Sequence, residues 1–297
     1  MRDVSIIIPS YNRPDDLEIV LPFYFVQDDV KEIIIIDDGS SKSYERIVEK
    51  YENFRKGEVK FIYYKNPCNS GAGASRNKGL ELATGEYILW GEDDAFLAPE
   101  YVKVLKSKIS SDKLVFGSIY YGIHPTMLDS EKKEIIKVQQ NSKRLLFDYD
   151  LLEGYYRIIN SEDVLVPWGH ALLMVRKDAY ANVKYFEGYA VNGYREETDA
   201  QIQIVKAGYS AIYTSDTCCY HFPAKNSNGG QHSANFFVFE FYKIKNNNIF
   251  LRRHYAFLRK HFGLKKTLFG MECVFVFNEV KLCVVKVINK LKRKMLQ

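Results

Sequence analysis

Two adjacent carboxylates, Asp93 and Asp94, are separated only by Gly91 and Glu92 from the strand-like run of residues 86–90. Carboxylate oxygens are the ligands that hard divalent cations such as Mg²⁺ and Mn²⁺ prefer. A cation held by them could neutralise a phosphate group and act on it as a Lewis acid. The pair therefore predicts a site for a divalent cation and a phosphate-bearing molecule.

A second acidic cluster lies at the start of a helix predicted over residues 196–208, where Glu196, Glu197 and Asp199 stand close together. A positioned carboxylate can serve as a general base that removes a proton from a hydroxyl group. The alternative is that acidic residues simply favour a helix N-terminus. Further along, His221 is a candidate metal ligand, with a structural histidine as the alternative.

The first hundred residues alternate between strand and helix patterns. Strands are predicted over residues 5–9, 32–37, 59–64 and 86–90, and helices over residues 15–26, 43–54 and 72–83. Continuous β-branched runs alternating with helices indicate a parallel sheet covered on both faces. Ligands bind at the carboxyl ends of such strands, and each predicted strand here is followed by a polar, acidic or glycine-rich segment.

The middle of the chain is less regular. Further strands are predicted over residues 114–120, 167–175 and 211–213, and residues 129–144 form a polar, charged insertion. From residue 236 onward the pattern is helical. We expect one α/β domain over residues 1–235, with a donor half at about 1–100 and an acceptor half at about 101–235, and a helical C-terminal extension over 236–297.

Four segments together resemble the inverting family 2 glycosyltransferases, which have the GT-A fold. In chain order they are SIIIPSYNR, EIIIIDDGS, NSGAGASRNKGLELATGEYILWGEDD and YREETDAQIQIVKAGY. The close resemblance covers about residues 4–100 and 165–222. It implies a Rossmann-like, mostly parallel central sheet flanked by helices, and a nucleotide-diphosphate sugar as donor.

The resemblance also implies roles for individual residues in binding the nucleotide sugar. Pro9 and Tyr11 would lie beside the base, and Asp38 would bind the edge of the base. Arg13, Arg76 and Asp93 would contact other parts of the nucleotide sugar. A hydrogen-bond acceptor such as the Asp38 carboxylate favours uracil, because uracil has an N–H group at that edge of the base. A UDP-sugar is therefore the favoured sugar donor. A solvated helix face is the alternative for Arg76.

For the chemistry itself, the resemblance implies that Asp94 binds the divalent cation, Mn²⁺ or Mg²⁺, with His221 as a second ligand. Glu197 aligns with the Asp that usually acts as base, and Glu196 or Asp199 are the alternatives. The sequence departs from the family at Gly91, where another Asp is often found; Glu92 is a possible substitute.

The remaining candidates concern the acceptor and the membrane. Trp168 could stack on an acceptor sugar, with a core tryptophan as the alternative, and residues 225–232 could form a lid or an ordinary surface loop. Residues 280–297 carry six basic and no acidic residues, and Val280, Val284, Val287, Ile288 and Leu291 share one helical face. Such a helix fits an anionic membrane surface or packs on the domain.

The composition of the chain limits its expected partners and cellular location. A net charge of +5 gives no argument for nucleic acid. Five cysteines without a C-x-x-C pattern predict neither a disulfide framework nor a zinc site. No apolar run reaches the length of a membrane span. We expect a cytoplasmic protein, peripheral to the membrane if attached at all. The family resemblance implies that the acceptor is a glycan or a lipid-linked glycan.

Two other functions fit parts of the pattern. A sugar nucleotidyltransferase also places a nucleotide on a parallel sheet, but the segment after the first strand, residues 9–13, lacks the glycines of those enzymes. A non-catalytic nucleotide-sugar-binding protein derived from a transferase is the second alternative, because of the changes at Gly91 and Glu197. The retained Asp93 and Asp94 argue against it.

Overall fold

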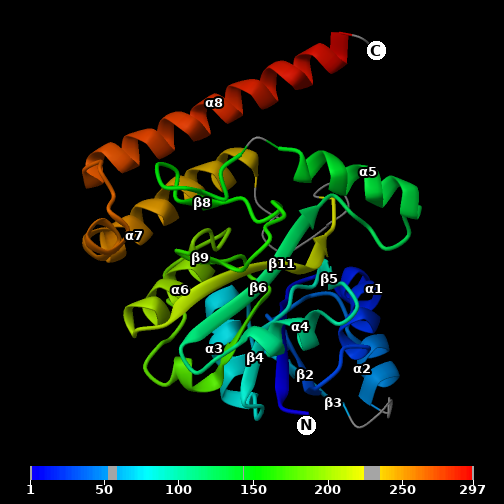
Figure 1. Ribbon diagram of the computed structural model, residues 1–297. Coiled ribbons are helices and arrows are strands. Elements are labelled where there is room, and N and C mark those ends of the chain that lie inside the picture. The colour runs from blue at the N-terminus through cyan, green and yellow to red at the C-terminus, as the bar shows by residue number, and fades with distance from the viewer. Residues whose placement is uncertain (1, 53–58, 143, 224–234, 296–297) are drawn as a thin grey trace.

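A nine-stranded sheet runs through the centre of the computed structural model, which describes residues 2–52, 59–142, 144–223 and 235–295 (Figure 1). The first four strands are β1 (Val4–Ser10), β2 (Val30–Asp37), β3 (Lys60–Lys65) and β4 (Tyr87–Trp90). They lie in the spatial order β3-β2-β1-β4, and all their pairings are parallel. This confirms the parallel sheet expected for the first hundred residues.

Three helices connect these strands: α1 (Pro14–Phe25), α2 (Glu45–Glu52) and α3 (Ala72–Leu82). Right-handed crossovers place α1 and α2 on one face of the sheet. The chain returns past β1 to reach β4, which places α3 on the other face (Figure 1). The strand order therefore reverses between β1 and β4, and this reversal opens a crevice at the carboxyl ends of the two strands.

The second half of the sheet is mixed. It contains β5 (Ala95–Leu97), β6 (Lys113–Tyr121), β9 (Val164–Val166), β10 (Leu173–Arg176) and β11 (Ser210–His221). Strand β10 runs antiparallel to β4 and β6, whereas β11 runs parallel to β6 and antiparallel to β5 and β9. Antiparallel β10 thus joins the parallel half to the rest of the sheet.

Two predicted strands differ from those observed. Of the strand expected over residues 167–175 only the last part is a strand, β10, and residues 167–172 form a connection in which Gly169 N–H donates to the side chain of Gln201. The strand expected over residues 211–213 continues to His221, since β6 and then β5 pair with its second part. That extension carries His221 to the edge of the crevice.

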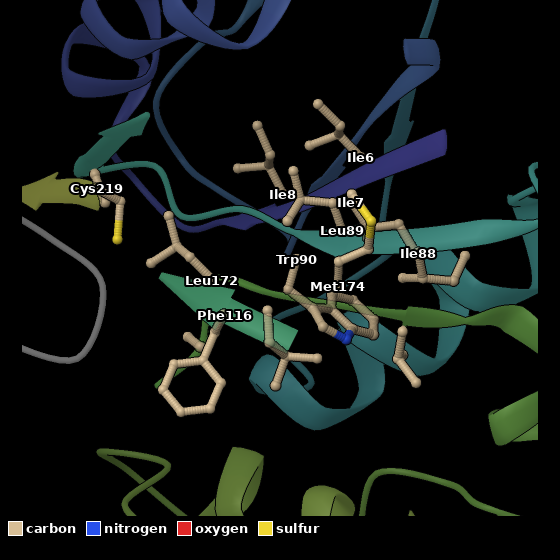
Figure 2. Close-up of a cluster of buried hydrophobic side chains, with 14 of the residues drawn as sticks. Ile6, Ile7, Ile8, Ile88, Leu89, Trp90, Phe116, Leu172, Met174 and Cys219 are labelled. Carbon is tan, nitrogen blue, oxygen red and sulfur yellow. The ribbon is translucent and has the colours of Figure 1, made fainter. Parts of the chain in front are cut away.

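The core lies where β1, β4, β10 and β6 meet (Figure 2). It is filled by fully buried side chains that the picture labels, among them Ile6, Ile7, Ile8, Ile88, Leu89, Phe116 and Met174. Their burial explains the continuous apolar runs in the sequence, because a strand covered on both faces exposes neither set of side chains.

Smaller elements surround the sheet. They are α4 (Tyr101–Lys108), α5 (Asp129–Gln140), β7 (Phe147–Asp148), β8 (Glu153–Gly154), the 3₁₀ helix η1 (Lys177–Tyr180) and α6 (Glu196–Lys206). The charged insertion expected over residues 129–144 is largely the helix α5. No residue of this helix is fully buried, and only Ile135 and Ile136 pack half-buried against the core, so its apolar face is narrow and gives a weak helix signal in the sequence.

The C-terminal part consists of α7 (Phe236–Phe262) and α8 (Leu268–Met295). Phe250, Leu251 and Leu258 of α7 belong to the same hydrophobic cluster as the sheet. Helix α8 crosses the outer side of α7 (Figure 1). Across the described residues, no helix combines the length and apolar character needed to cross a membrane.

A buried polar cluster anchors α6 to α7. The carboxylate of Asp199, which is fully buried, accepts hydrogen bonds from Arg253 Nε at 2.6 Å, His254 Nε2 at 2.8 Å and Tyr189 Oη at 2.7 Å. Burial opposes ionisation, but the hydrogen bonds from His254 and Arg253 outweigh it and hold the pKa of Asp199 well below its usual range. Asp199 therefore stabilises the fold as a carboxylate.

Replacing this carboxylate tests the anchor. We expect Asp199→Asn to lower the free energy of unfolding at pH 7 by about 3 kcal/mol, because it leaves Arg253 and His254 without their partner. A lowered pKa gives stability above the unfolded pKa that is lost as the pH falls. The difference from the wild type should therefore shrink below about pH 4. Urea denaturation from pH 7 to 3.5 measures both effects.

The control for that experiment is Asp150→Asn, which removes an exposed ion pair with Lys266. It should cost less than about 1 kcal/mol. Equal losses in the two variants, or a loss in Asp199→Asn that does not change with pH, would show that the cluster is not an ionic anchor.

Candidate active site

A pocket lies at the carboxyl ends of β1, β2 and β4, where the strand order reverses. Of the residues proposed from the sequence, it is lined by Pro9, Tyr11, Arg13, Asp38, Arg76, Asp93, Asp94, Glu197 and His221. A second pocket adjoins it and shares Glu92, Glu197 and His221 with the first. Glu196 and Asp199 line neither pocket, and Trp168 borders only the second.

Asp38 fixes the glycine-rich turn before α3. Its Oδ1 accepts hydrogen bonds from Asn66 Nδ2 and Ser70 N, each at 2.9 Å, and its Oδ2 accepts one from Gly71 N at 2.8 Å. The neighbouring Asp37 instead accepts a hydrogen bond from Tyr63 Oη at 2.6 Å. The second Asp of the pair thus faces the pocket while the first is part of the sheet.

Arg13 bridges the adjacent carboxylates. Its Nη1 lies 3.0 Å from Asp93 Oδ1 and 2.6 Å from Asp94 Oδ2, and Ser10 Oγ donates to Asp93 at 2.8 Å. Burial and the neighbouring Asp94 raise the pKa of Asp93 to about 6, and Arg13 opposes that rise. Two buried carboxylates this close need a cation between them, and Arg13 provides it here.

A third acidic residue joins Asp94 and His221. One ligand atom from each of Glu92, Asp94 and His221 lies within 4.8 Å of the others, which makes this a candidate metal centre. Strand pairing creates it, because β11 pairs with β5 so that His221 lies opposite Ala95, the residue after Asp94. The sequence singled out Asp94 and His221, but gave Glu92 only as a substitute for a missing acid.

The orientation of the His221 ring suits a metal ligand. Its Nδ1 lies 3.0 Å from the Phe222 carbonyl oxygen, to which it donates, so Nε2 faces Asp94 Oδ1 at 3.3 Å. Although burial lowers the pKa of His221, Asp94 and Glu92 raise it above the usual value. Burial also raises the pKa of Glu92, to about 8. A bound divalent cation would relieve this crowding of acids, and the oxygen and nitrogen donors fit Mn²⁺ or Mg²⁺.

Gly91 is required by packing. A Cβ at this position would lie 2.7 Å from Ile8 Cγ1 and 3.0 Å from Tyr24 Cε1. Tyr24 is itself fixed, since its hydroxyl donates to the Ala95 carbonyl at 3.0 Å. An Asp at position 91 has no room here, so the family's additional carboxylate is replaced by glycine and the third acid of the cluster is Glu92.

The acidic start of α6 is held by Arg76. Its Nη1 lies 2.5 Å from Glu196 Oε2, its Nη2 contacts Glu197 Oε1, and its guanidinium lies over the ring of Trp90. Glu196 is buried, and this burial raises its pKa to about 8 against the effect of Arg76. The side chain of Glu197 is 31% exposed and reaches both pockets. Of the two, only Glu197 is placed to meet a bound molecule.

Two sequence candidates lie elsewhere. Asp199 is turned towards α7, and its carboxylate has no path to either pocket, so we set it aside as a base. Trp168 is only 3% exposed and packs edge to face against Phe147 and Phe250. It supports the wall of the second pocket and offers no free ring face. The possible lid at residues 225–232 lies outside the described residues.

The fold is of the GT-A type, and known proteins agree. S. aureus TarS 1–349 in complex with UDP-GlcNAc superposes with a TM-score of 0.53 at 19% identity, covering 90% of this chain and 76% of that one. GalNAc-T7 with UDP, GalNAc and Mn²⁺ gives a TM-score of 0.57 at 14% identity, covering 84% of this chain and 50% of that one.

The family model described as glycosyl transferase family 2 matches residues 5–171, and the chain belongs to that family. The cholesterol galactosyltransferase of Borreliella burgdorferi is 31% identical over 134 residues, which are 45% of this chain and 36% of that protein. The poly(ribitol-phosphate) β-N-acetylglucosaminyltransferase TarS of Staphylococcus aureus is 31% identical over 106 residues, which are 35% of this chain and 18% of that protein. These matches span about a third or less of each relative's length.

Packing at Gly91 can be tested directly. We expect Gly91→Ala to lower the free energy of unfolding by roughly 1–3 kcal/mol, because the added methyl group must displace Ile8 or Tyr24. The matched control is Gly270→Ala in α8, where the nearest atom is a side-chain oxygen of Thr267 at 3.2 Å. That change should be neutral or stabilising by up to about 1 kcal/mol. Thermal and urea unfolding measure both; a neutral Gly91→Ala would contradict the packing requirement.

Proposed function

We propose that this chain is an inverting glycosyltransferase that moves a sugar from a nucleoside diphosphate sugar, with a UDP-sugar favoured, to a hydroxyl group of a glycan or a lipid-linked glycan. One observation carries the proposal: Glu197 is shared by two adjoining pockets, one of which has the carboxylates and cations suited to a nucleotide diphosphate. Family membership supports it, as do the UDP and UDP-GlcNAc complexes of TarS.

The first pocket binds the donor in this proposal. Pro9 and Tyr11 line the side where the base would lie, and Asp38 accepts a hydrogen bond from the base edge. Asp93 and Arg13 lie further along, towards the sugar and phosphates. Arg76 contributes positive charge to the wall while it holds the acids of α6 in place.

Glu92, Asp94 and His221 hold a divalent cation, Mn²⁺ or Mg²⁺, in this proposal. The cation supplies Lewis-acid stabilisation of the diphosphate leaving group. The chain's own residues prepare the site: Phe222 N–H donates to the Asp94 carbonyl at 2.9 Å and fixes the loop, and Arg13 offsets the remaining negative charge.

Glu197 is the proposed general base. It accepts the proton of the acceptor hydroxyl as that oxygen attacks the anomeric carbon, and the nucleoside diphosphate leaves from the opposite side of the sugar. The hydrogen bond from Arg76 restricts the Glu197 side chain to the junction of the pockets. Glu196 is a positioning residue, since its buried carboxylate fixes the other end of the same guanidinium.

Donor binding and transfer can be separated by mutation. UDP should bind in the presence of Mn²⁺, and Asp94→Asn should weaken that binding at least tenfold because a carboxylate ligand is lost. Glu197→Gln should retain UDP binding but reduce transfer or donor hydrolysis by about 10²-fold or more. Isothermal titration with UDP and a screen of nucleotide sugars measure the two steps.

Ser215→Ala, at a side chain remote from both pockets, serves as the control and should change neither step. Tight UDP binding in the wild type with no turnover of any donor would instead favour a non-catalytic nucleotide-sugar-binding protein. Turnover that survives in Glu197→Gln would exclude this residue as the base.

We also propose that the C-terminal extension attaches the domain to an anionic membrane surface. One face of α8 packs inward through Phe275 and Glu279, and Glu279 pairs with Lys243 of α7 at 2.7 Å. The opposite face is apolar yet exposed, with side-chain exposures of 73% at Phe269, 73% at Phe277 and 52% at Val284. The helix thus packs on the domain with one face, and we propose that the second face contacts lipid.

The exposed stripe begins earlier in the chain than the sequence indicated. It follows helical spacing from residue 269 through Val280 to Ile288, while the side chains of Val287 and Leu291 lie outside those described. The segment from residue 280 to 297 contains six basic and no acidic residues, which favours anionic lipid headgroups. A protein that acts on a lipid-linked acceptor gains from such an attachment.

Liposome sedimentation tests the attachment. The wild type should bind vesicles containing phosphatidylglycerol more strongly than neutral phosphatidylcholine vesicles. Changing Phe269, Phe277 and Val284 together to Ser should reduce binding at least tenfold, since each buried apolar side chain contributes roughly 1.5–3 kcal/mol. Val26→Ser with Leu165→Ser, at exposed apolar residues elsewhere, is the control. Unchanged binding in the triple variant would refute the proposed surface.

A further inference from the structure

Arg157 lines the second pocket and differs from the other arginines around the site. Arg13 and Arg76 each bridge two carboxylates, and Arg195 donates to Asn247 and to backbone carbonyl groups. Among the described residues, no carboxylate lies within ion-pair distance of Arg157, and its buried Nε has no hydrogen-bond partner. The pocket therefore contains a positive charge that the fold itself does not neutralise.

Aromatic rings hold Arg157 in position. Its guanidinium carbon lies 4.4 Å from the ring centroid of Tyr121 and 4.5 Å from that of Tyr155. Stacking of this kind stabilises the cation through the ring faces and leaves N–H groups at the edge of the guanidinium plane for a ligand. The rings also limit the side chain's freedom, so less entropy is lost when a ligand binds.

The location of Arg157 relates it to the chemistry. Tyr121 separates it from His221, whose ring centroid lies 5.3 Å from that of Tyr121. The cation is therefore one aromatic ring away from the candidate metal centre, on the side of the second pocket. Glu197, the proposed base, lines the same pocket. A molecule that brings a hydroxyl to Glu197 can also reach Arg157.

We propose that Arg157 binds an anionic group, a phosphate or a carboxylate, on the acceptor. The proposal rests on the function proposed above, because it takes the second pocket as the acceptor site. A guanidinium recognises either oxyanion through paired N–H donors. An oxyanion satisfies both the charge and the paired N–H donors of the guanidinium, whereas a neutral hydroxyl group offers only a hydrogen-bond acceptor, so the site favours a charged acceptor.

The other charges nearby support this assignment. Arg144 lies over the same Tyr155 ring at 5.1 Å, so this ring contacts a second cation. Three acids line the pocket: Glu197 is paired with Arg76, Glu153 accepts a hydrogen bond from the hydroxyl of Tyr194 at 3.3 Å, and Glu92 belongs to the candidate metal centre.

Two matched pairs of probes isolate the anionic group: glycerol 3-phosphate with glycerol, and glucuronate with glucose. Each is titrated into the full chain saturated with UDP and Mn²⁺, so that the donor pocket is filled, and binding is followed by ligand-observed NMR. In the wild type, at least one anionic probe should bind at least about tenfold more tightly than its neutral partner. Which of the two does so tells phosphate from carboxylate.

Arg157→Gln should abolish this preference and leave the affinity for UDP unchanged. Arg157→Lys keeps the positive charge but lacks the paired N–H donors of a guanidinium, so it should retain only part of the preference for the anionic probe. Arg252→Gln, at an exposed arginine of α7, is the control for general loss of positive charge.

The possible failures are distinct. If the wild type does not bind UDP, the proposed function fails. If UDP binds but the anionic probes show no preference, or if the preference survives in Arg157→Gln, the assignment of Arg157 is wrong while the proposed function stands. A loss of UDP affinity in Arg157→Gln would also overturn the assignment, since Arg157 would then contact the donor.

Discussion

The site depends on neutralising a concentration of negative charge at one edge of the sheet. Five carboxylates gather there, from Glu92, Asp93, Asp94, Glu196 and Glu197. Two arginines make this possible, because Arg13 bridges one adjacent pair and Arg76 bridges the other. A guanidinium can do this since its donors point in several directions within one plane. Without Arg13 and Arg76, the carboxylates would be protonated or the pocket would open to water.

Topology decides which acids meet. The reversal of strand order between β1 and β4 places Arg13 beside Asp93, and the return of α3 across the other face places Arg76 beneath the start of α6. The pairing of β11 with β5 adds His221 to the same edge. Each contact joins segments far apart in the chain, so the charge balance and the sheet depend on each other.

The acidic start of α6 shows how one short segment serves several purposes. Successive residues of a helix point in directions about 100° apart. Glu196 therefore lies behind Arg76, Glu197 faces the pockets, and Asp199 points to α7. The last of these forms the buried cluster with His254 that joins α6 to the C-terminal helices. Helix α7 thus supports the element that carries the proposed base.

The sequence by itself determined the parallel half of the sheet and part of the lining of the first pocket. Buried β-branched runs are local signals, and the reversal rule places Asp38 and Asp94 at one edge without coordinates. Only the tertiary structure decided that Arg13 and Arg76 bridge acids, that Glu92 joins His221, and that Trp168 and Asp199 turn away from the first pocket. Those outcomes depend on strand register and on side-chain packing between distant segments, which local periodicity does not encode. The mostly exposed helix α5, in which only Ile135 and Ile136 pack half-buried against the core, left a weak signal in the sequence.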